Sequence, residues 1–514
     1  MQPSTIGPVQ SQERIQTIDI LRAFALFGVV VANFTVDNQD VTPADGRTGF
    51  FDQLVYWPIR FFIDDKAMAM YCFLFGLGFA IQLLRAEERK TAFVFTFIRR
   101  MIVLFIIGVI AFSLSAETIP HEYAVVGLLL LIFYKIPWKF LPVLALLCVL
   151  VPTARNIIIL QKSAAVANSH KEILIDTTLL NRYVGVYQNQ TDITRKAIIV
   201  RDKDTLFSES MVMRIRLSAV SDSEFIRRGL NQTFSFHKDS TGGIGSFVIS
   251  NGQNNLVYRR INANLQEALK KQIENRSITN QMKNKPSYKQ FVVNTATSLW
   301  NRFKNWSWKD FFWGTGITDI LPYFLIGLYV GRRRVFYDVT SNKRFLEKVK
   351  LWGFIIGTIG MLTWLGLEVW NYIHNIEYRS YLQVTRLLVY LSWSLGVMAM
   401  TFAYAAALTL LLQNDKWKKK LAFLSPVGRM GLTNYLIHVI PYVVLFHYGF
   451  DLSGKIGPFY RLLLALPVYA GLIFLSHWWF RHFRIGPVEW LWRSLTHFKF
   501  QPMRLRSSNE SEEK

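Results

Sequence analysis

The stretch MIVLFIIGVIAFSLSAET at residues 101–118 has a single charged side chain, that of Glu117. A helix needs about 20 mostly apolar residues to cross a bilayer. Other stretches of the chain have the same character, and together they predict transmembrane helices at 18–36, 67–84, 101–118, 122–136, 138–158, 317–332, 351–370, 386–412, 425–447 and 458–480. Some of these could instead be buried helices of a soluble protein, but so many such runs in one chain argue against it. We expect an all-α polytopic membrane protein with about ten transmembrane helices.

The charges support this interpretation and set the orientation. The chain has 514 residues, 18% of them charged, and its 59 basic and 35 acidic residues give a net charge of +24. A balance this basic can indicate nucleic-acid binding. Here, however, the basic residues gather in alternate loops, whereas 113–121 has no Lys or Arg and 37–49 has only Arg47. Because Lys and Arg concentrate in cytoplasmic loops, we expect both termini in the cytoplasm and no nucleic-acid partner.

A long polar segment, 159–310, interrupts the apolar runs. It separates an N-terminal half at 14–158 from a C-terminal half at 311–500, which a polar tail at 501–514 follows. Apolar and polar residues alternate in short runs with turn signals between them, which predicts a small antiparallel β domain at about 178–262 and then a polar helical segment. The orientation places this insert outside the cytoplasm. The only cysteines, Cys72 and Cys148, lie in apolar spans, so the insert has no disulfide framework, and no metal motif is present.

Ionisable residues inside a span are expensive and are therefore candidates for function. Asp19 and Arg22 stand three positions apart in the first span and share a helix face. They could form an anion-binding pair for the phosphates of a nucleotide-bearing donor, or a pair that reaches to water at the span end. Asn434 and His438 lie one turn apart in the ninth span. The histidine could carry a proton or be a hydrogen-bonded structural residue.

Another polar group is expected at the outer end of the third span, where Glu117, His121 and Glu122 occur. A histidine beside a carboxylate suits general-base work on a hydroxyl or amine. The same group could also be an ordinary hydrated loop.

Three motifs resemble the YeiB-like family of uncharacterised bacterial membrane proteins. The first comprises Arg14, Ile15, Asp19, Leu21, Arg22, Gly28 and Asn33, the second runs from Gly428 to Leu436, and the third runs from Gly486 to Arg493. The resemblance covers roughly 14–155 and 311–500, with the β insert extra to the common pattern. It implies a bacterial cytoplasmic (inner) membrane protein. Two departures are that Ala23 replaces the usual glycine and that Ala111 stands where many members have histidine.

The insert resembles the small accessory β domain of serine β-lactamase-like proteins. The residues that carry this resemblance begin with the run from Leu180 to Tyr187 and end with Tyr258, Arg259 and Arg260. That domain is an accessory, and the insert has no nucleophile-plus-base arrangement.

The YeiB-like family is usually grouped with multi-span acyltransferases such as heparan-α-glucosaminide N-acetyltransferase. The resemblance therefore implies that an acyl group moves from acyl-CoA, with no tightly bound cofactor, to an extracytoplasmic glycan or lipid. Arg22, Asp19 and Arg429 would meet the donor, Asn33, Asn434 and His438 would line the path, and Glu117 and His121 would activate the acceptor. A small-molecule transporter without covalent chemistry and a membrane-anchored scaffold with a binding β domain remain alternatives. The acyl group, the acceptor and the oligomeric state stay open.

Overall fold

A computed structural model describes residues 15–36, 49–91, 93–116, 118–151, 177–190, 196–209, 214–227, 232–250, 255–276, 287–304, 315–373, 383–450, 452–453 and 455–504. The chain divides into two compact units. One combines Met1–Thr153, Pro286–Leu367 and Val389–Lys514, and the other combines Ala154–Lys285 and Glu368–Leu388. Glu117 and residues 152–158 of the predicted fifth span lie outside the described residues.

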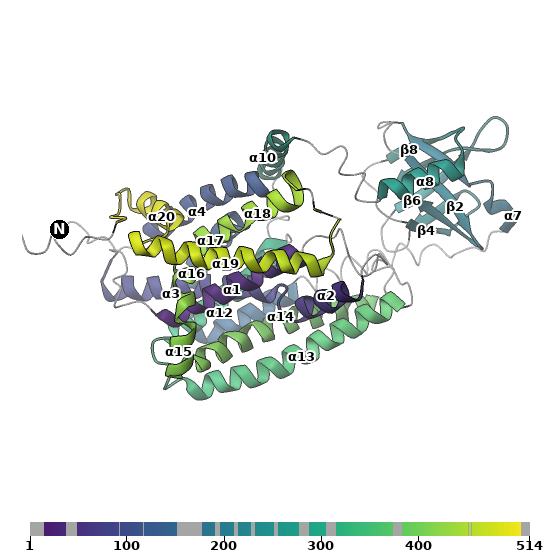
Figure 1. Ribbon diagram of the computed structural model, residues 1–514. Coiled ribbons are helices and arrows are strands. Elements are labelled where there is room, and N and C mark those ends of the chain that lie inside the picture. The colour runs from purple at the N-terminus through teal and green to yellow at the C-terminus, as the bar shows by residue number, and fades with distance from the viewer. Residues whose placement is uncertain are drawn as a thin grey trace, which may run out of the picture. The chain divides into compact units, whose positions relative to one another are not determined.

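The first unit is a bundle of apolar helices (Figure 1). Its N-terminal helices are α1 (Gln16–Thr35), α2 (Phe50–Phe62), α3 (Lys66–Glu88), α4 (Val94–Ser115) and α5 (Pro120–Phe133), followed by an apolar helix at Trp138–Val151. Its later helices are α10 (Tyr288–Lys304), α12 (Thr315–Arg332), α13 (Lys343–Ile373), α14 (Gln383–Leu411), α15 (Asp415–Leu421), α16 (Ser425–Arg429), α17 (Gly431–Ile437), α18 (Val439–Val443), α19 (Pro458–His482) and α20 (Pro487–His497). The C-terminal end of α13 and the N-terminal end of α14 belong to the second unit.

The number of spans is the main difference from the sequence-based expectation. Within the described residues six helices are long and apolar enough to cross a membrane, or seven when a bent helix pair is included. That pair, Asp415–Arg429 and Gly431–Tyr448, is bent by 72° and replaces the straight ninth span that we predicted. The predicted fourth, fifth and sixth spans also form helices, at Pro120–Phe133, Trp138–Val151 and Thr315–Arg332, but these are not among the six.

The helix α1 organises the bundle, because it packs against α3, α16 and α19. Its mostly apolar sequence makes it a core helix that is buried on most faces. Small residues allow neighbouring backbones to approach closely. At Gly76 of α3, an added Cβ would stand 2.2 Å from the carbonyl oxygen of Phe324 in α12, so these two helices touch through their backbones.

The second unit contains a closed antiparallel barrel with strands in sequence order, as the alternating sequence partly predicted. The strands are β1 (Gly185–Asn189), β2 (Lys196–Asp202), β3 (Thr205–Glu209), β4 (Arg214–Ala219), β5 (Glu224–Arg227), β6 (Gln232–Lys238), β7 (Ile244–Ser250) and β8 (Asn255–Ile261). Aromatic side chains fill its core, with Tyr187, Phe234 and Phe247 essentially inaccessible to solvent. The short helix α7 (Thr177–Leu180) precedes the barrel and α8 (Leu265–Arg276) follows it.

The boundary of the insert also differs from the expected 159–310. The helix α10 belongs to the helical unit, because its residues pack on α4. The hydroxyl of Tyr288 donates to the carbonyl oxygen of Leu114 at 2.9 Å, and the Phe303 ring packs edge-on against the Phe105 ring, with 5.5 Å between the ring centres. The amphipathic sequence of α10 explains this, since its apolar side chains find partners on the bundle.

Candidate functional site

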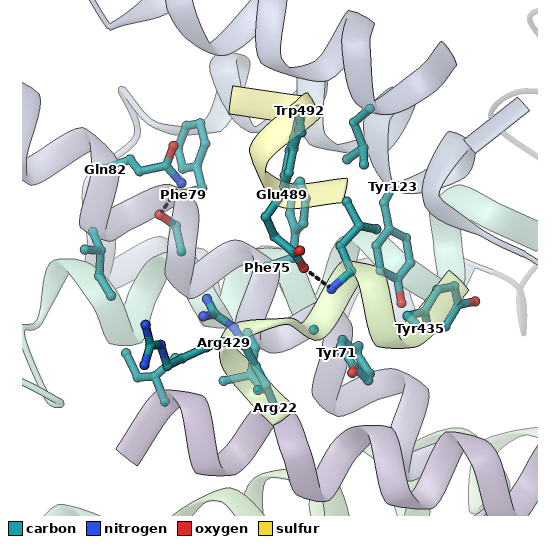
Figure 2. A pocket seen from close by; sticks show the side chains of 18 of the residues that line it. Arg22, Tyr71, Phe75, Phe79, Gln82, Tyr123, Arg429, Tyr435, Glu489 and Trp492 are labelled. Carbon is teal, nitrogen blue, oxygen red and sulfur yellow. Dashed lines mark hydrogen bonds between the residues drawn. The ribbon is translucent and has the colours of Figure 1, made fainter. Parts of the chain in front are cut away.

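A cavity of about 320 Å³ lies at one end of the helical bundle (Figure 2). It is lined by the start of α1, by α3 from Tyr71 to Arg85, by the middle of α4, by the start of α5, by the break between α16 and α17, and by the tail helix α20. Its polar lining residues are Asp19, Arg22, Tyr71, Gln82, Arg85, Arg100, Tyr123, Arg429, Tyr435, Glu489, Trp492 and Arg493. The volume falls at the lower end of the range of small-molecule sites, about 300–1,000 Å³.

Two of the predicted binding residues, Arg22 and Arg429, meet in this cavity, although more than 400 positions separate them in the sequence. The reason is a backbone contact between α1 and α16. At Gly428 an added Cβ would stand only 1.8 Å from the carbonyl oxygen of Asp19. No side chain fits there, so glycine at this position brings the first and second sequence motifs together.

The predicted pair of Asp19 and Arg22 is confirmed by its geometry. Arg22 Nη1 lies 3.3 Å from Asp19 Oδ1, and the aspartate side chain is almost completely buried while the arginine side chain is one-third exposed. The carboxylate therefore holds the guanidinium at the cavity wall. Arg429 is held differently, with its guanidinium 4.0 Å from the ring centre of Phe480 and Nη2 donating to the carbonyl oxygen of Arg484 at 3.3 Å.

Three further arginines line the same cavity: Arg85, Arg100 and Arg493. The guanidinium of Arg100 lies 4.0 Å from the ring centre of Trp492, and Trp492 in turn donates from Nε1 to the carbonyl oxygen of Arg100 at 2.8 Å. Sequence reasoning assigned Arg85 and Arg100 to membrane orientation, and Arg493 to orientation and to the end of the third motif. Their positions in three separate helices carried no sign that they converge.

The carboxylate of Glu489 closes the cavity on the side of α20. Its Oε1 accepts from the backbone N–H of Leu432 at 2.7 Å and of Thr433 at 3.0 Å, and Oε2 accepts from the Thr433 hydroxyl at 2.6 Å (Figure 2 labels Glu489 and marks one of these bonds). The Thr433 hydroxyl also accepts from the N–H of Val488 at 3.0 Å. These contacts satisfy the first N–H groups of α17 and tie the third sequence motif to the second.

The predicted residues of the ninth span form a buried polar seam beside the cavity. Asn434 Nδ2 donates to the carbonyl oxygen of Val427 at 3.1 Å and to the hydroxyl of Ser476 at 2.8 Å. Asn33 Nδ2 lies 3.1 Å from His438 Nε2, so two residues of the predicted path, from different spans, are in direct contact. His438 Nδ1 bonds the carbonyl oxygen of Tyr435.

These contacts define the state of His438. A carbonyl oxygen can only accept, so Nδ1 carries the hydrogen and Nε2 accepts from the Asn33 amide, which is the neutral imidazole. The residue has no exposed surface and does not line the cavity. In this conformation His438 therefore links α1 to the bent span and is closed to substrate.

His121 does not lie where we expected it. We placed it at the outer end of the third span, but its backbone N would be 2.2 Å from a Cβ added at Gly108. Gly108 stands seven residues before the end of α4, or about 10 Å along the helix axis. The chain therefore turns back into the bundle after α4. The ring of His121 packs edge-on against Phe112 at 5.0 Å and is absent from the cavity lining, whereas Ile119, Pro120 and Tyr123 are part of it.

Tyrosines are the second feature of the cavity that the sequence did not predict. Tyr71, Tyr123 and Tyr435 line it from α3, α5 and α17, and the rings of Tyr71 and Tyr435 lie 6.0 Å apart. The Tyr123 hydroxyl lies 3.2 Å from Cys72 Sγ. Tyrosines in apolar spans give no distinctive sequence signal, because they are equally common at membrane interfaces. Among the described residues no group of three potential metal ligands comes together.

Comparison with known proteins places the chain among uncharacterised relatives. A family model described as "Protein of unknown function (DUF418)" matches residues 330–499, which contain the second and third sequence motifs. The chain is 24% identical over 518 aligned residues to the "Uncharacterized protein YxaH" of Bacillus subtilis (strain 168), covering 97% of this chain and 98% of that protein.

Two shorter matches share one part of the chain each. A segment is 43% identical over 84 residues to the "Uncharacterized protein YeiB" of Escherichia coli (strain K12), covering 16% of this chain and 21% of that protein. Another is 36% identical over 132 residues to an "Uncharacterized 39.9 kDa protein in amylase 3'region" of Bacillus acidopullulyticus, covering 26% of this chain and 37% of that protein. No solved structure matches the chain significantly. The comparisons thus support the YeiB-like resemblance and name neither an acyltransferase nor a β-lactamase-like domain.

Proposed function

We propose that this membrane protein binds a phosphate-bearing acyl donor, acyl-CoA, in the arginine-lined cavity and transfers its acyl group to a glycan or lipid acceptor. The observation that carries the proposal is the convergence of five arginines, from α1, α3, α4, α16 and α20, on one cavity. Guanidinium groups match the geometry of phosphate oxygens and bind them with paired hydrogen bonds.

The cavity lining has more arginines than carboxylates. Among the described residues that line the cavity, the acidic ones are Asp19 and Glu489, and both make structural contacts. Asp19 pairs with Arg22, and Glu489 caps α17. An anion would therefore enter a site with a net positive charge, where low-dielectric walls strengthen the attraction.

The rest of the wall suits an acyl chain. Phe75, Phe79 and Leu104 line the cavity next to the charged residues. A ligand with a phosphate group and an apolar tail would match both parts of the lining, whereas a small inorganic anion would match only the arginines. The polar seam of Asn434, His438 and Asn33 starts next to Tyr435 in the chain, and we propose that the acyl group moves along it.

In acyl transfer the C–S bond of the thioester breaks and a C–O bond to the acceptor hydroxyl forms. The hydroxyl proton passes to a base, which returns it to the departing CoA thiolate. Only His438 of the predicted histidines belongs to the polar seam, and it would accept this proton after its contact with Asn33 opens. His121, packed on Phe112, and Glu117, outside the described residues, take no part in the proposal.

The proposal also fixes a topology. We infer that the chain resides in the bacterial inner membrane with both termini in the cytoplasm and the β insert outside, since basic loops alternate with loops poor in Lys and Arg. Reporter fusions that are active only in one compartment test this. An alkaline phosphatase fused after Asn189 should be active, and one fused after Arg504 should be inactive; the reverse pattern would overturn the orientation.

Binding of a long-chain acyl-CoA tests the main proposal. We expect purified protein to bind palmitoyl-CoA, and Arg429→Gln to weaken binding about tenfold, because a charge-assisted hydrogen bond contributes about 1.5–3 kcal/mol. Arg333→Gln is the matched control, since Arg333 also packs on an aromatic ring, Phe345 at 4.1 Å, but is outside the cavity. Equal binding by wild type and Arg429→Gln would refute the proposal.

One observation favours a transporter as a second candidate. The bent helix pair breaks at Met430, between two cavity-lining residues, and discontinuous helices often surround the substrate site of a transporter. Substrate flux into proteoliposomes that requires no CoA thioester would favour this candidate over acyl transfer.

A further inference from the structure

A second cavity, of about 700 Å³, lies on another face of α1 and is separate from the arginine-lined one. Its α1 wall is formed by Leu21, Phe24, Ala25 and Gly28, which recur at helical spacing. Its α14 wall, with Tyr404, Ala407, Leu408 and Leu411, has the same spacing. Two helix faces thus form a groove, and the first residues of α3 close its floor.

Small side chains keep this groove open. An added Cβ at Gly28 would lie 2.6 Å from the Cβ of Ala67, so α1 and α3 touch at the floor. Ala25 and Ala407 leave space above this contact. Phe24, Phe62 and Leu411, which also line the groove, are 40%, 53% and 37% exposed, so its mouth opens onto the outer surface of the bundle. In a membrane-spanning bundle that surface faces lipid.

One end of the groove is basic. Lys350 of α13 lines it and is half-buried. The sequence near this end of the groove is rich in exposed basic residues. They lie at the start of α13 and in α15, which begins four residues after Leu411. These residues are Lys343, Arg344, Lys348, Lys416, Lys418, Lys419 and Lys420. Clusters of this kind next to a membrane segment attract anionic lipid headgroups, with about 1 kcal/mol for each basic residue near the surface.

The other end of the groove has a cation that is already engaged. Lys66 is 1% exposed, and its Nζ donates to the carbonyl oxygen of Arg60 at 2.9 Å and lies 4.6 Å from the ring centre of Trp393. Trp393 packs on Trp364 of α13. Since Trp364 stands fourteen residues after Lys350, the two ends are about 21 Å apart along the helix axis. This exceeds one leaflet, which is half of the roughly 30 Å hydrocarbon core.

We propose that this groove is a binding site for an anionic phospholipid, with one acyl chain between α1 and α14 and the phosphate on Lys350. The apolar walls and the lipid-facing mouth favour an acyl chain, and Lys350, the single lysine in the wall at the basic end, favours a negatively charged headgroup. The site is independent of the proposed acyl-donor cavity, so either can fail without the other.

Native mass spectrometry of the full chain tests the site. The purified protein is equilibrated in detergent with equal amounts of dioleoylphosphatidylglycerol and dioleoylphosphatidylcholine, and the ratio of the two bound lipids is measured. We expect wild type to retain the anionic lipid preferentially and Lys350→Gln to reduce that preference about fivefold, the equivalent of one basic contact of about 1 kcal/mol. Lys348→Gln removes an exposed lysine of the same helix that belongs to the basic surface but not to the groove, so it should reduce the preference less than Lys350→Gln does.

Variants that fill the groove distinguish lipid binding in the groove from lipid binding on the basic surface. Ala407→Trp and Leu411→Trp should both abolish retention of the preferred lipid, and gel filtration checks that each variant remains folded. The proposal is overturned if wild type shows no preference, if Lys350→Gln equals Lys348→Gln, or if the preference survives in a folded groove-filling variant.

Discussion

Replacing Glu489 by glutamine tests whether the tail helix α20 is held over the arginine-lined cavity by a single carboxylate. The carboxylate accepts two backbone N–H bonds, at 2.7 and 3.0 Å, and the Thr433 hydroxyl bond at 2.6 Å. Glutamine retains one accepting oxygen but presents an NH₂ group to Thr433. It also loses the negative charge at the start of α17.

The magnitude follows from these contacts. Hydrogen bonds to a charged group contribute about 1.5–3 kcal/mol, and we take about 2 kcal/mol for the loss on amide substitution. A free-energy difference of this size raises the population of the detached tail helix about 30-fold. Other contacts of α20, such as the bond from Trp492 to the Arg100 carbonyl oxygen, remain, so the helix should open more often without the bundle unfolding.

Limited trypsin digestion measures this opening at Arg493, a half-buried cavity residue within α20. When opening and closing are fast compared with cleavage, the cleavage rate follows the open population. We expect cleavage after Arg493 to be about 30-fold faster in Glu489→Gln and unchanged in Glu347→Gln, which alters an exposed glutamate of α13. Because Thr433→Val removes the same contact from the other side, the double variant should be less affected than the sum of the two. A rate within threefold of wild type, or fully additive effects, would refute the proposed latch.

Three further outcomes follow from the packing and charges. Gly428→Ala must separate α1 from α16, since its Cβ would lie 1.8 Å from the Asp19 carbonyl oxygen, and should destabilise the protein by about 1–3 kcal/mol in a detergent unfolding titration; an unchanged midpoint would contradict the contact. Asn33→Leu removes the donor to His438 and should cost about 1–3 kcal/mol in the same titration, whereas a neutral result would show that the pair is not formed. Burial, and then the neighbouring arginines, lower the pKa of His497 below its usual value of 6.5, so the detached tail binds the proton more readily. Tryptic cleavage of α20 should therefore accelerate as the pH falls below about 6.5, and His497→Gln should remove that dependence; a pH profile identical to wild type would contradict it.

The sequence predicted the local elements of the site well. Asp19 and Arg22 pair as their spacing indicates, and Asn434 and His438 face one polar seam. Helical periodicity and the cost of burying a charge in a membrane are both local properties, so one span at a time suffices to find such residues.

What the sequence did not reveal depends on contacts between distant segments. The backbone contact of Gly428 with α1 brings Arg22 and Arg429 together, and no feature of either motif announces it. The convergence of Arg100 and Arg493 was hidden because basic residues at span ends also serve orientation. The return of the chain into the bundle before His121 was missed for a different reason: the short apolar helix Pro120–Phe133 looks like a weak span in the sequence.

In the β insert, too, the sequence predicted the local structure but not the contacts between distant segments. Alternating residues correctly predicted an antiparallel β domain, but closure requires β1 to pair with β8, nearly the whole length of the domain away. The sheet edges disappear only through this non-local pairing, which no single run of residues encodes.

The most direct test of the central claim is an experimental density map of the protein with a non-hydrolysable palmitoyl-CoA analogue. We predict phosphate density against Arg22 and Arg429 and tail density along Phe75 and Phe79 in the cavity under α20. An empty cavity at saturating analogue, or an analogue bound only elsewhere on the bundle, would contradict the account.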